Sequence, residues 1–338
     1  MNAPAPLIAQ TAAQFEHQHA AHCESGVMAN LLRHHGVHVS EPLVFGLSSA
    51  LSFAYLPFIK LGGLPLVAYR MPPKAIIKGL QKPFGISFRF ETFRSPEAGQ
   101  QRLDALLREQ RVVGLQTSVY WLPYFPEDMR FHFNAHNLLV YGKDGDEYLI
   151  SDPVGEDPVR CATADMNRAR FAKGVLAPKG LLYYPQSIAR TDVASEDVLK
   201  AIRKTARIMR APIPLFGAPG MRTLARAIER LKPEGKDTGH FIGHVVRMQE
   251  EIGTGGGGFR FLYSAFLQEA AEITQRPALA GFAEQMLAIG DDWRAFALAS
   301  ARMLRGRDPM QPRAIGALLR KQADAESLFF RDLSKAAS

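Results

Sequence analysis

The stretch HNLLVYGKDGDEYLISDP, residues 136–153, decides the fold more than any other part of this 338-residue chain. Its two apolar runs, 136–142 and 147–151, are rich in β-branched and aromatic residues, which favours strands. The short segment between them contains Asp-Gly and predicts a tight hairpin turn. We therefore expect antiparallel strands that bring His136, at the start of the first, close to Asp152, just after the second.

Working outward from this hairpin, the sequence predicts an α+β fold in its first half and an all-α second half. Further strands are expected at 64–70, 86–93, 112–121 and 180–185, and helices at 24–35, from residue 41 onward, and at 96–110. The second half is predicted to be helical at 195–210, 219–232, 238–252, 259–275, 277–304 and 312–335. The change of composition places a domain boundary between 1–186 and 187–338.

The composition is that of a globular protein with a basic surface. Lys and Arg number 41 against 33 Asp and Glu, which gives a net charge of +8 and favours acidic partners. Two cysteines exclude a disulfide framework, and residues 1–22 lack a signal-peptide pattern, so we expect a cytoplasmic protein. The apolar segment 42–59 has the length of a membrane span, but its serines, glycine and prolines predict buried core.

One of the two cysteines, Cys23, stands directly before the helix expected at 24–35. The dipole and the unbonded N–H groups of a helix N-terminus stabilise a thiolate, so this position suits a nucleophile. A buried packing residue and a metal ligand are the alternatives. His34, His35 and His38 cluster nearby, but their spacing does not match that of a zinc finger, and solvated histidines explain them better.

The hairpin supplies partners for this thiol. We expect His136 to accept the thiol proton and Asp152 to hold the imidazole in the required tautomer. His132 is an alternative base, but it lies before the apolar strand. A cysteine on an N-terminal helix, followed by His and Asp on later paired strands, is the chain order of papain-like enzymes.

A resemblance to the N-terminal domain of the BtrH family, named for the butirosin biosynthetic acyltransferase, rests on several ordered segments. These are HCESGVMANLLRHHG (22–36), SEPLVFGLSSALSFAY (40–55), VYWLPY (119–124) and HNLLVYGKDGDEYLISDP (136–153). The second half, with EEIGTGGGGFRFLYSAFLQEAAE (250–272) and DDW, resembles the helical domain often fused behind it.

This resemblance implies a papain-like fold and acyl transfer from an acyl carrier protein thioester to an amine, in specialised metabolism. The nucleophile, base and orienting acid of the family map onto Cys23, His136 and Asp152. Papain-like enzymes also use a Gln before the cysteine as an oxyanion donor; here the role falls to Gln18, with a neighbouring histidine, His17 or His22, as a competing assignment. No metal or cofactor is expected, because the substrate would be a phosphopantetheine thioester.

Two sets of side chains are candidates for contacts with substrates and partners. Aromatic residues expected to line an acyl or acceptor pocket are Phe45, Tyr55, Tyr120, Trp121 and Tyr124, with ordinary core as the alternative for the phenylalanine. A basic helical stripe, formed by Lys200, Arg203, Lys204 and Arg207, is either a solvated face or a docking site for an acidic carrier protein. We expect no nucleic-acid or membrane partner, and a homodimer is left open.

Two alternatives to acyl transfer stay open from the sequence. The same triad serves a cysteine peptidase or amidase that uses water, and a protein with a degenerate site would be a non-catalytic binding module. The second cysteine, Cys161, has no recognisable partner and is predicted to be structural. The run GTGGGG at 253–258 follows a helix rather than a strand, which favours a loop between helices over a dinucleotide site.

Overall fold

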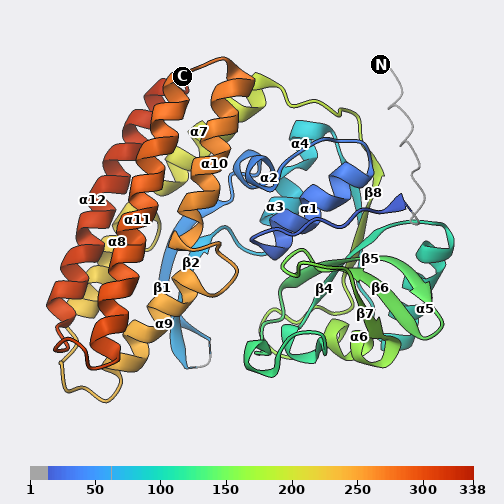
Figure 1. Ribbon diagram of the computed structural model, residues 1–338, viewed down its shortest axis with the longest axis horizontal. Coiled ribbons are helices and arrows are strands. Elements are labelled where there is room, and N and C mark those ends of the chain that lie inside the picture. The colour runs from blue at the N-terminus through green and yellow to red at the C-terminus, as the bar shows by residue number, and fades with distance from the viewer. Residues whose placement is uncertain (1–13, 62) are drawn as a thin grey trace. The chain divides into compact units, whose positions relative to one another are not determined.

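The computed structural model describes residues 14–61 and 63–338 (Figure 1). The expectation that no signal peptide is present concerns residues 1–22, of which 1–13 lie outside the described residues. The chain forms two units. The first contains the described residues up to Val44 and Ile76–Val193, and the second contains Phe45–Ala75 and Ala194–Ser338. The predicted boundary at 186/187 lies close to 193/194, where the chain passes from the first unit to the second. It leaves residues 45–75, which belong to the second unit, in the first half.

The first unit is built around a six-stranded antiparallel sheet with the strand order β3-β8-β4-β5-β6-β7. The strands are β3 (Ser87–Glu91), β4 (Val113–Thr117), β5 (His136–Asp144), β6 (Glu147–Ser151), β7 (Val159–Ala162) and β8 (Leu182–Ser187). The helices are α1 (Cys23–His34), α2 (Glu41–Leu47, which continues into the second unit), α3 (Ala75–Gly79, which begins there), α4 (Gln81–Phe84), α5 (Pro96–Arg108) and α6 (Thr163–Arg170). Short 3₁₀ turns, η2 (Val119–Trp121) and η3 (Glu127–Met129), follow β4.

The hydrophobic core of this unit lies between α5 and the sheet. Buried leucines of α5 pack with alternate residues of the central strands, among them Leu138 and Val140 of β5 and Tyr148 and Ile150 of β6. His136 and Asp152 continue these two rows, because side chains two residues apart lie on one face of a strand. The core therefore supports the positions where the candidate site is expected.

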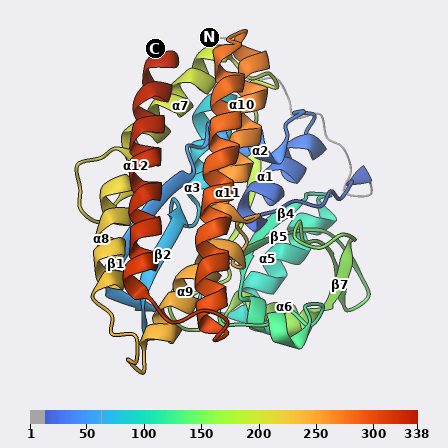
Figure 2. The same cartoon turned by 60° about the vertical axis from the view of Figure 1, so that its left-hand side comes forward.

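The second unit combines helices with a two-stranded antiparallel hairpin. Its helices are α7 (Ser195–Met209), α8 (Gly217–Glu229), α9 (Thr238–Glu250), α10 (Arg260–Thr274), α11 (Ala278–Leu304) and α12 (Pro312–Ala336), with a 3₁₀ turn η4 (Gly257–Phe259) before α10. The long α11 and α12 lie side by side in Figure 1 and again in Figure 2. The hairpin joins β1 (Leu51–Leu61) to β2 (Leu64–Arg70), and β1 packs on α8.

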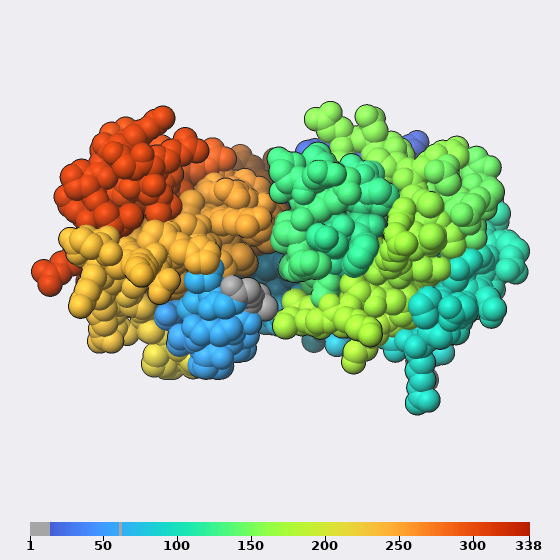
Figure 3. Space-filling view, turned by 90° about the horizontal axis from the view of Figure 1, so that it is seen from below, coloured from blue at the N-terminus to red at the C-terminus, as the bar shows by residue number. Residues whose placement is uncertain are grey.

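The predicted fold class, an α+β part with its first helix on an antiparallel sheet followed by a helical part, is confirmed. The helical second unit also includes the β1–β2 hairpin, which comes from the first half of the sequence. The apolar segment 42–59 divides into α2 and β1 instead of forming one helix, and pairing with β2 satisfies the backbone of β1. Figure 3 shows part of this hairpin, in blue, on the surface of the second unit. Phe58 of β1 is 70% exposed.

Among the described residues, no helix is both long and apolar enough to cross a membrane.

A fully buried ion pair ties three helices of the second unit together. Arg260 of α10 donates from Nε and Nη2 to the two carboxylate oxygens of Glu326 on α12, at 2.9 and 2.8 Å. Trp293 of α11 donates from Nε1 to the same carboxylate at 2.6 Å. Every donor and acceptor named here finds a partner, which is the condition under which a buried charge pair is tolerated.

The glycine run before α10 is a packed loop. Its backbone adopts positive φ at Gly253 and again from Gly255 to Gly258. A Cβ on Gly258 would lie 2.5 Å from the ring of Tyr69, so only glycine fits there. This matches the prediction of a loop between helices.

Replacing Glu326 with Ala should strongly destabilise the second unit, because Arg260 would remain buried without its counter-charge. We expect a loss of about 3–5 kcal/mol, measured as a shift of the urea unfolding midpoint. The control is Asp324→Ala on the same helix, whose carboxylate is 64% exposed and pairs with Arg222. That variant should change stability by about 1 kcal/mol or less, and equal losses in the two variants would contradict the importance of the buried pair.

Candidate active site

Cys23 is the first residue of helix α1, which begins and ends one residue earlier than the helix predicted at 24–35. The residue before it, His22, caps the helix: its Nδ1 accepts a hydrogen bond from the Ser25 backbone N–H at 3.3 Å. Glu41 of α2 accepts from the Ala21 and His22 backbone N–H groups at 2.8 and 2.9 Å and from the Ser25 hydroxyl at 2.8 Å. Burial raises the pKa of the Glu41 carboxyl, against these donors, which lower it. The residues on either side of Cys23, from Ala21 to Ser25, are thus fixed by hydrogen bonds to Glu41 and to the His22 ring.

Glycine allows α1 to meet the loop that follows Asp152. A Cβ on Gly26 would lie 2.6 Å from Cβ of Ala20 and 2.7 Å from Cβ of Pro153. The Ala20 N–H also donates to the Pro153 carbonyl at 2.6 Å. Since α1 packs on β5 as well, the helix that starts at Cys23 contacts both the strand of His136 and the loop of Asp152.

A one-residue bulge places His136 and Asp152 on the same face of the sheet. Near the turn, Asp144 pairs with Glu147, but the register shifts by one residue between Val140 and Gly142, so Leu139 pairs with Ser151. Without this shift, Asp152 would continue opposite Leu139 and face away from His136. With the shift, Asp152 and His136 lie on the same face of the sheet, as diagonal neighbours on the adjacent strands β6 and β5.

The result is a short hydrogen bond between the two buried side chains. His136 Nε2 lies 2.6 Å from Asp152 Oδ2, and the two residues are 4% and 1% exposed. Burial by itself lowers the pKa of His136, but the charge and the hydrogen bond of Asp152 outweigh it. The Cys23 side chain adds to the rise, and the pKa of His136 reaches about 10. Asp152 therefore favours the protonated imidazole, which also interacts with the side chain of Cys23.

Tyr124 plays a part that the sequence did not reveal. Its hydroxyl donates to Asp152 Oδ2 at 2.8 Å, so this side chain, expected to line a substrate pocket, directs its polar end to Asp152. Burial, followed by the charge of Asp152 and this hydrogen bond, raises the pKa of Tyr124 well above 10. The next ring, Phe125, lies edge-on to the His136 ring at 5.5 Å and 82°. No periodicity marks Tyr124; only its tertiary contact does.

The alternative base, His132, and the expected oxyanion donor, Gln18, are both exposed. His132 is exposed and stacks on Tyr120, with ring centroids 4.1 Å apart. Gln18 is exposed, and the contact it makes is through its backbone carbonyl, which accepts from Asn30 Nδ2 at 2.9 Å. One competing ring, His17, lies within hydrogen-bond distance of Ser151 Oγ and the Gly155 carbonyl oxygen, at 2.8 and 3.2 Å. The oxyanion role of Gln18 stays a prediction.

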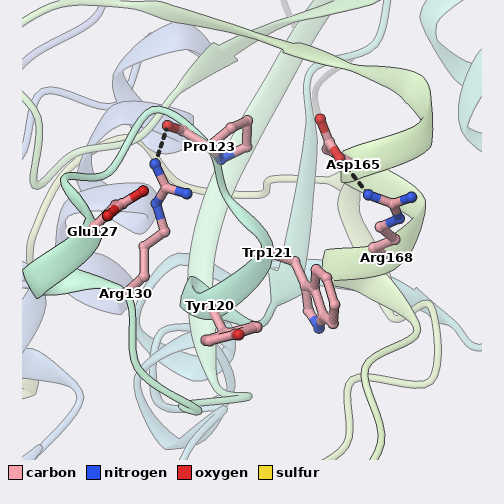
Figure 4. A pocket seen from close by; sticks show the side chains of 7 residues that line it. All are labelled: Tyr120, Trp121, Pro123, Glu127, Arg130, Asp165 and Arg168. Carbon is pink, nitrogen blue, oxygen red and sulfur yellow. Dashed lines mark hydrogen bonds and ion pairs between the residues drawn. The ribbon is translucent and has the colours of Figure 1, made fainter.

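Two of the expected pocket aromatics do line a surface pocket of the first unit, shown in Figure 4. Tyr120 and Trp121 are 40% and 38% exposed, and the pocket has a volume of about 390 Å³. The other lining residues are Pro123, Glu127, Arg130, Asp165 and Arg168. Arg168 lies 5.9 Å from the centre of the Trp121 ring and pairs with Asp165 at 3.2 Å.

Phe45 and Tyr55 belong to the second unit and do not line that pocket. Phe45 is fully buried and stacks on Phe259, with ring centroids 5.1 Å apart, so the expectation of a substrate contact is wrong and the core alternative holds. Tyr55 lies on β1, 6% exposed, at the edge of a separate cavity of about 530 Å³ within the second unit. Both positions depend on residues 45–75 folding with the helices.

The basic stripe on α7 is partly neutralised within the second unit. Lys200 and Arg203 both approach Glu196, at 3.8 and 2.6 Å, and Arg203 also donates to the Ala337 carbonyl. Lys204 and Arg207 are exposed on the same helix. The spacing of the stripe is as predicted, and its partner is not tested by these contacts.

The second cysteine is part of the core. Cys161 of β7 is 1% exposed and packs in the core between α5 and the sheet. Burial, with the nearby charges of Asp165 and Glu147, raises the pKa of its thiol to about 12. A thiol in that state is unreactive at neutral pH.

Comparison with known proteins identifies both parts of the chain. The model of the butirosin biosynthesis protein H N-terminal domain matches residues 22–153, and that of a domain of unknown function, DUF4872, matches residues 164–333. A solved structure described as a C39-like peptidase from Bacillus anthracis aligns with a TM-score of 0.37 and 13% identity, over 53% of this chain and 98% of that one. No curated protein matches the chain.

Iodoacetamide at pH 7.5 should alkylate Cys23 and leave Cys161 unmodified. Both cysteines are buried, at 6% and 1% exposure, but Cys23 lies beside the imidazole of His136, whereas burial and two nearby carboxylates keep the Cys161 thiol protonated. Peptide mass spectrometry measures both sites. Replacing His136 with Ala should slow alkylation of Cys23 by about tenfold or more, because the imidazolium that stabilises the thiolate is lost. A Cys161→Ser variant is the matched control and should react at the wild-type rate. Equal reactivity of the two cysteines would contradict the role assigned to His136.

The contribution of His136 to stability should depend on pH. Its pKa in the folded chain, about 10, exceeds the ordinary value of 6.5, so folding favours the protonated form. That contribution is complete below about pH 6.5 and is lost as the pH rises towards about 10. The difference in unfolding free energy between the wild type and His136→Gln should therefore shrink between pH 6 and 10. A difference that stays constant over this range would show that His136 titrates normally.

Proposed function

We propose that this chain, which belongs to the DUF4872 family through residues 164–333 and carries the N-terminal domain of butirosin biosynthesis protein H at residues 22–153, is a papain-like cysteine acyltransferase. Its substrates would be a carrier-protein thioester and an amine. The observation that carries the proposal is the buried hydrogen bond of 2.6 Å between His136 and Asp152, next to a cysteine at a helix N-terminus. This is the arrangement that nucleophilic catalysis by cysteine requires.

In the first step, the Cys23 thiolate attacks the thioester carbonyl and a carbon–sulfur bond forms. The bond to the pantetheine sulfur then breaks, and protonated His136 gives its proton to that leaving thiolate. An acyl-enzyme remains, with His136 neutral. In the second step an amine attacks the acyl carbon and His136 accepts the amine proton. The amide leaves as the bond to Cys23 breaks, which restores the thiolate and the imidazolium.

The oxyanion of each step would lie at the start of α1. The Ala21 and His22 N–H groups are bonded to Glu41, and the Ser25 N–H is bonded to the His22 ring. The hydrogen bonds of the described residues give the Cys23 N–H no acceptor, so this group is the first candidate for the oxyanion donor. Gln18 would supply a second donor only after its exposed side chain turns inward.

The amine acceptor is proposed to bind in the pocket of Tyr120 and Trp121. Aromatic rings attract ammonium groups, and Tyr120 and Trp121 stay 40% and 38% exposed although His132 stacks on the first and Arg168 lies over the second. Glu127, whose carboxylate has no partner among the described residues, adds a negative charge to a pocket that Arg130 and Arg168 also line. The acidic carrier protein is proposed to dock on α7, chiefly through Lys204 and Arg207, because Lys200 and Arg203 share the single negative charge of Glu196.

The decisive experiment is intact-mass analysis of the wild type and Cys23→Ala after incubation with a set of acyl-thioesters. We expect a covalent acyl adduct on the wild type and none on the variant. Added amines should then discharge the adduct to amides faster than water does. Discharge by water alone would make the protein a hydrolase with the same triad. The absence of any adduct, together with an unreactive Cys23, would favour a binding module.

Replacing Trp121 with Ala should weaken acceptor binding without changing acylation. Loss of one aromatic face is expected to raise the KM for the amine about tenfold, while the rate of adduct formation on Cys23 stays within about twofold. Steady-state kinetics with a single thioester separates the two effects. Leu298→Ala, at a leucine that is 64% exposed in the second unit, is the control. Slower acylation in Trp121→Ala would contradict a role limited to the acceptor.

A further inference from the structure

The carboxylate of Asp152 accepts a hydrogen bond from a second side chain besides His136. Oδ2 accepts hydrogen bonds from His136 Nε2 at 2.6 Å and from the Tyr124 hydroxyl at 2.8 Å. The other oxygen, Oδ1, lies 3.4 Å from the Val154 backbone N. Asp152 is 1% exposed, so solvent contributes little, and the two side chains that share Oδ2 compete for its negative charge.

Arg130 fixes the backbone of the segment that carries Tyr124. Arg130 donates from Nε to the Phe125 carbonyl at 2.7 Å and from Nη2 to the Pro123 carbonyl at 2.9 Å, so it grips the residues on both sides of Tyr124. Figure 4 shows the contact between Arg130 and Pro123. The ring of Phe125 also touches His136. One guanidinium group therefore holds a segment that contacts both members of the His136–Asp152 pair.

The titratable groups around this network come from several elements. Tyr124 faces Asp152, which follows β6, and Cys161 of β7. His136 of β5 faces Asp152 and Cys23 of α1. On the other side of the site, Tyr183 of β8 lies near Cys23 and Glu24 and donates to Asn137 Oδ1 at 3.0 Å. Tyr124 is the tyrosine whose hydroxyl reaches Asp152.

We propose that Tyr124 is a positioning residue for the cysteine chemistry proposed above: its hydroxyl holds Oδ2 of Asp152 in place and takes up part of its charge, and Arg130 keeps Tyr124 in that position. The inference rests on the proposed function. Acyl transfer needs His136 to be protonated in the first step and neutral in the second. Partial neutralisation of Asp152 lowers its hold on the imidazole proton, so His136 can release that proton and accept the one from the amine.

The test is Tyr124→Phe, which keeps the ring and removes the donor. The rate of Cys23 alkylation by iodoacetamide is measured from pH 5 to pH 12, and its alkaline inflection reports the loss of the proton from His136. We expect this inflection to move up by about one pH unit. We also expect discharge of the acyl-enzyme by an amine to slow about tenfold, with less change in acylation.

The matched control is Tyr148→Phe. That tyrosine lies on β6 in the same sheet, and its hydroxyl donates to a different carboxylate, Asp104 Oδ1, at 2.7 Å. Its removal should leave the inflection unchanged, whereas an equal shift would mean that any lost tyrosine hydroxyl has this effect. In an Asp152→Asn background, Tyr124→Phe should have no further effect, because both residues act through one oxygen.

Arg130→Gln provides a second route to the same network if Tyr124→Phe folds poorly, which the urea midpoint reports. It should move the inflection in the same direction by a smaller amount. An inflection that stays in place or moves down in folded Tyr124→Phe overturns the inference. Alkylation needs no acyl donor. A shifted profile in a protein that no thioester acylates would therefore support the positioning role while refuting acyl transfer.

Discussion

The short hydrogen bond between His136 and Asp152 is the interaction on which the candidate site depends, and the register of β5 against β6 makes it possible. The two residues are only 16 apart in sequence, yet the hairpin turn does not by itself put them on one face. The bulge between Val140 and Gly142 does so, since a one-residue shift exchanges the faces of every later side chain. Bulges often re-aim side chains next to active sites, and this one performs that role.

Burial strengthens this hydrogen bond and also requires that the other oxygen lone pairs of Asp152 find donors. A carboxylate that is 1% exposed is tolerated only when its oxygens are bonded, and the structure provides His136, the Tyr124 hydroxyl and a contact with the Val154 N–H. Because residue 26 is glycine, the loop that follows Asp152 packs directly against α1 through Pro153. The helix that bears the thiol therefore contacts the loop that bears the acid. A small change in any of these contacts would therefore alter the position of Asp152 and its hydrogen bond to the imidazole of His136.

Sequence patterns anticipated the strands and helices that have strong periodicity, including the strand at 64–70, but they missed β1 and the unit that residues 45–75 join. Residues 42–59 form an uncharged, mainly apolar run, and such a run does not reveal whether it forms a helix or a strand, or which core it joins. The structure places β1 against β2 and α8, in the second unit. Phe45 and Tyr55 were consequently assigned to a substrate pocket, although their surroundings are made by helices that lie more than a hundred residues further along the chain.

The sequence by itself determined the order Cys23, His136, Asp152, the helix that starts at the thiol, and the hairpin that joins the other two residues. These are properties of short segments, where local propensity and turn chemistry decide. Only the tertiary structure decided which face Asp152 occupies and which hydroxyl it receives. Tyr124 lies 28 residues from Asp152, and their contact depends on how separate segments pack, which no local pattern in the sequence records.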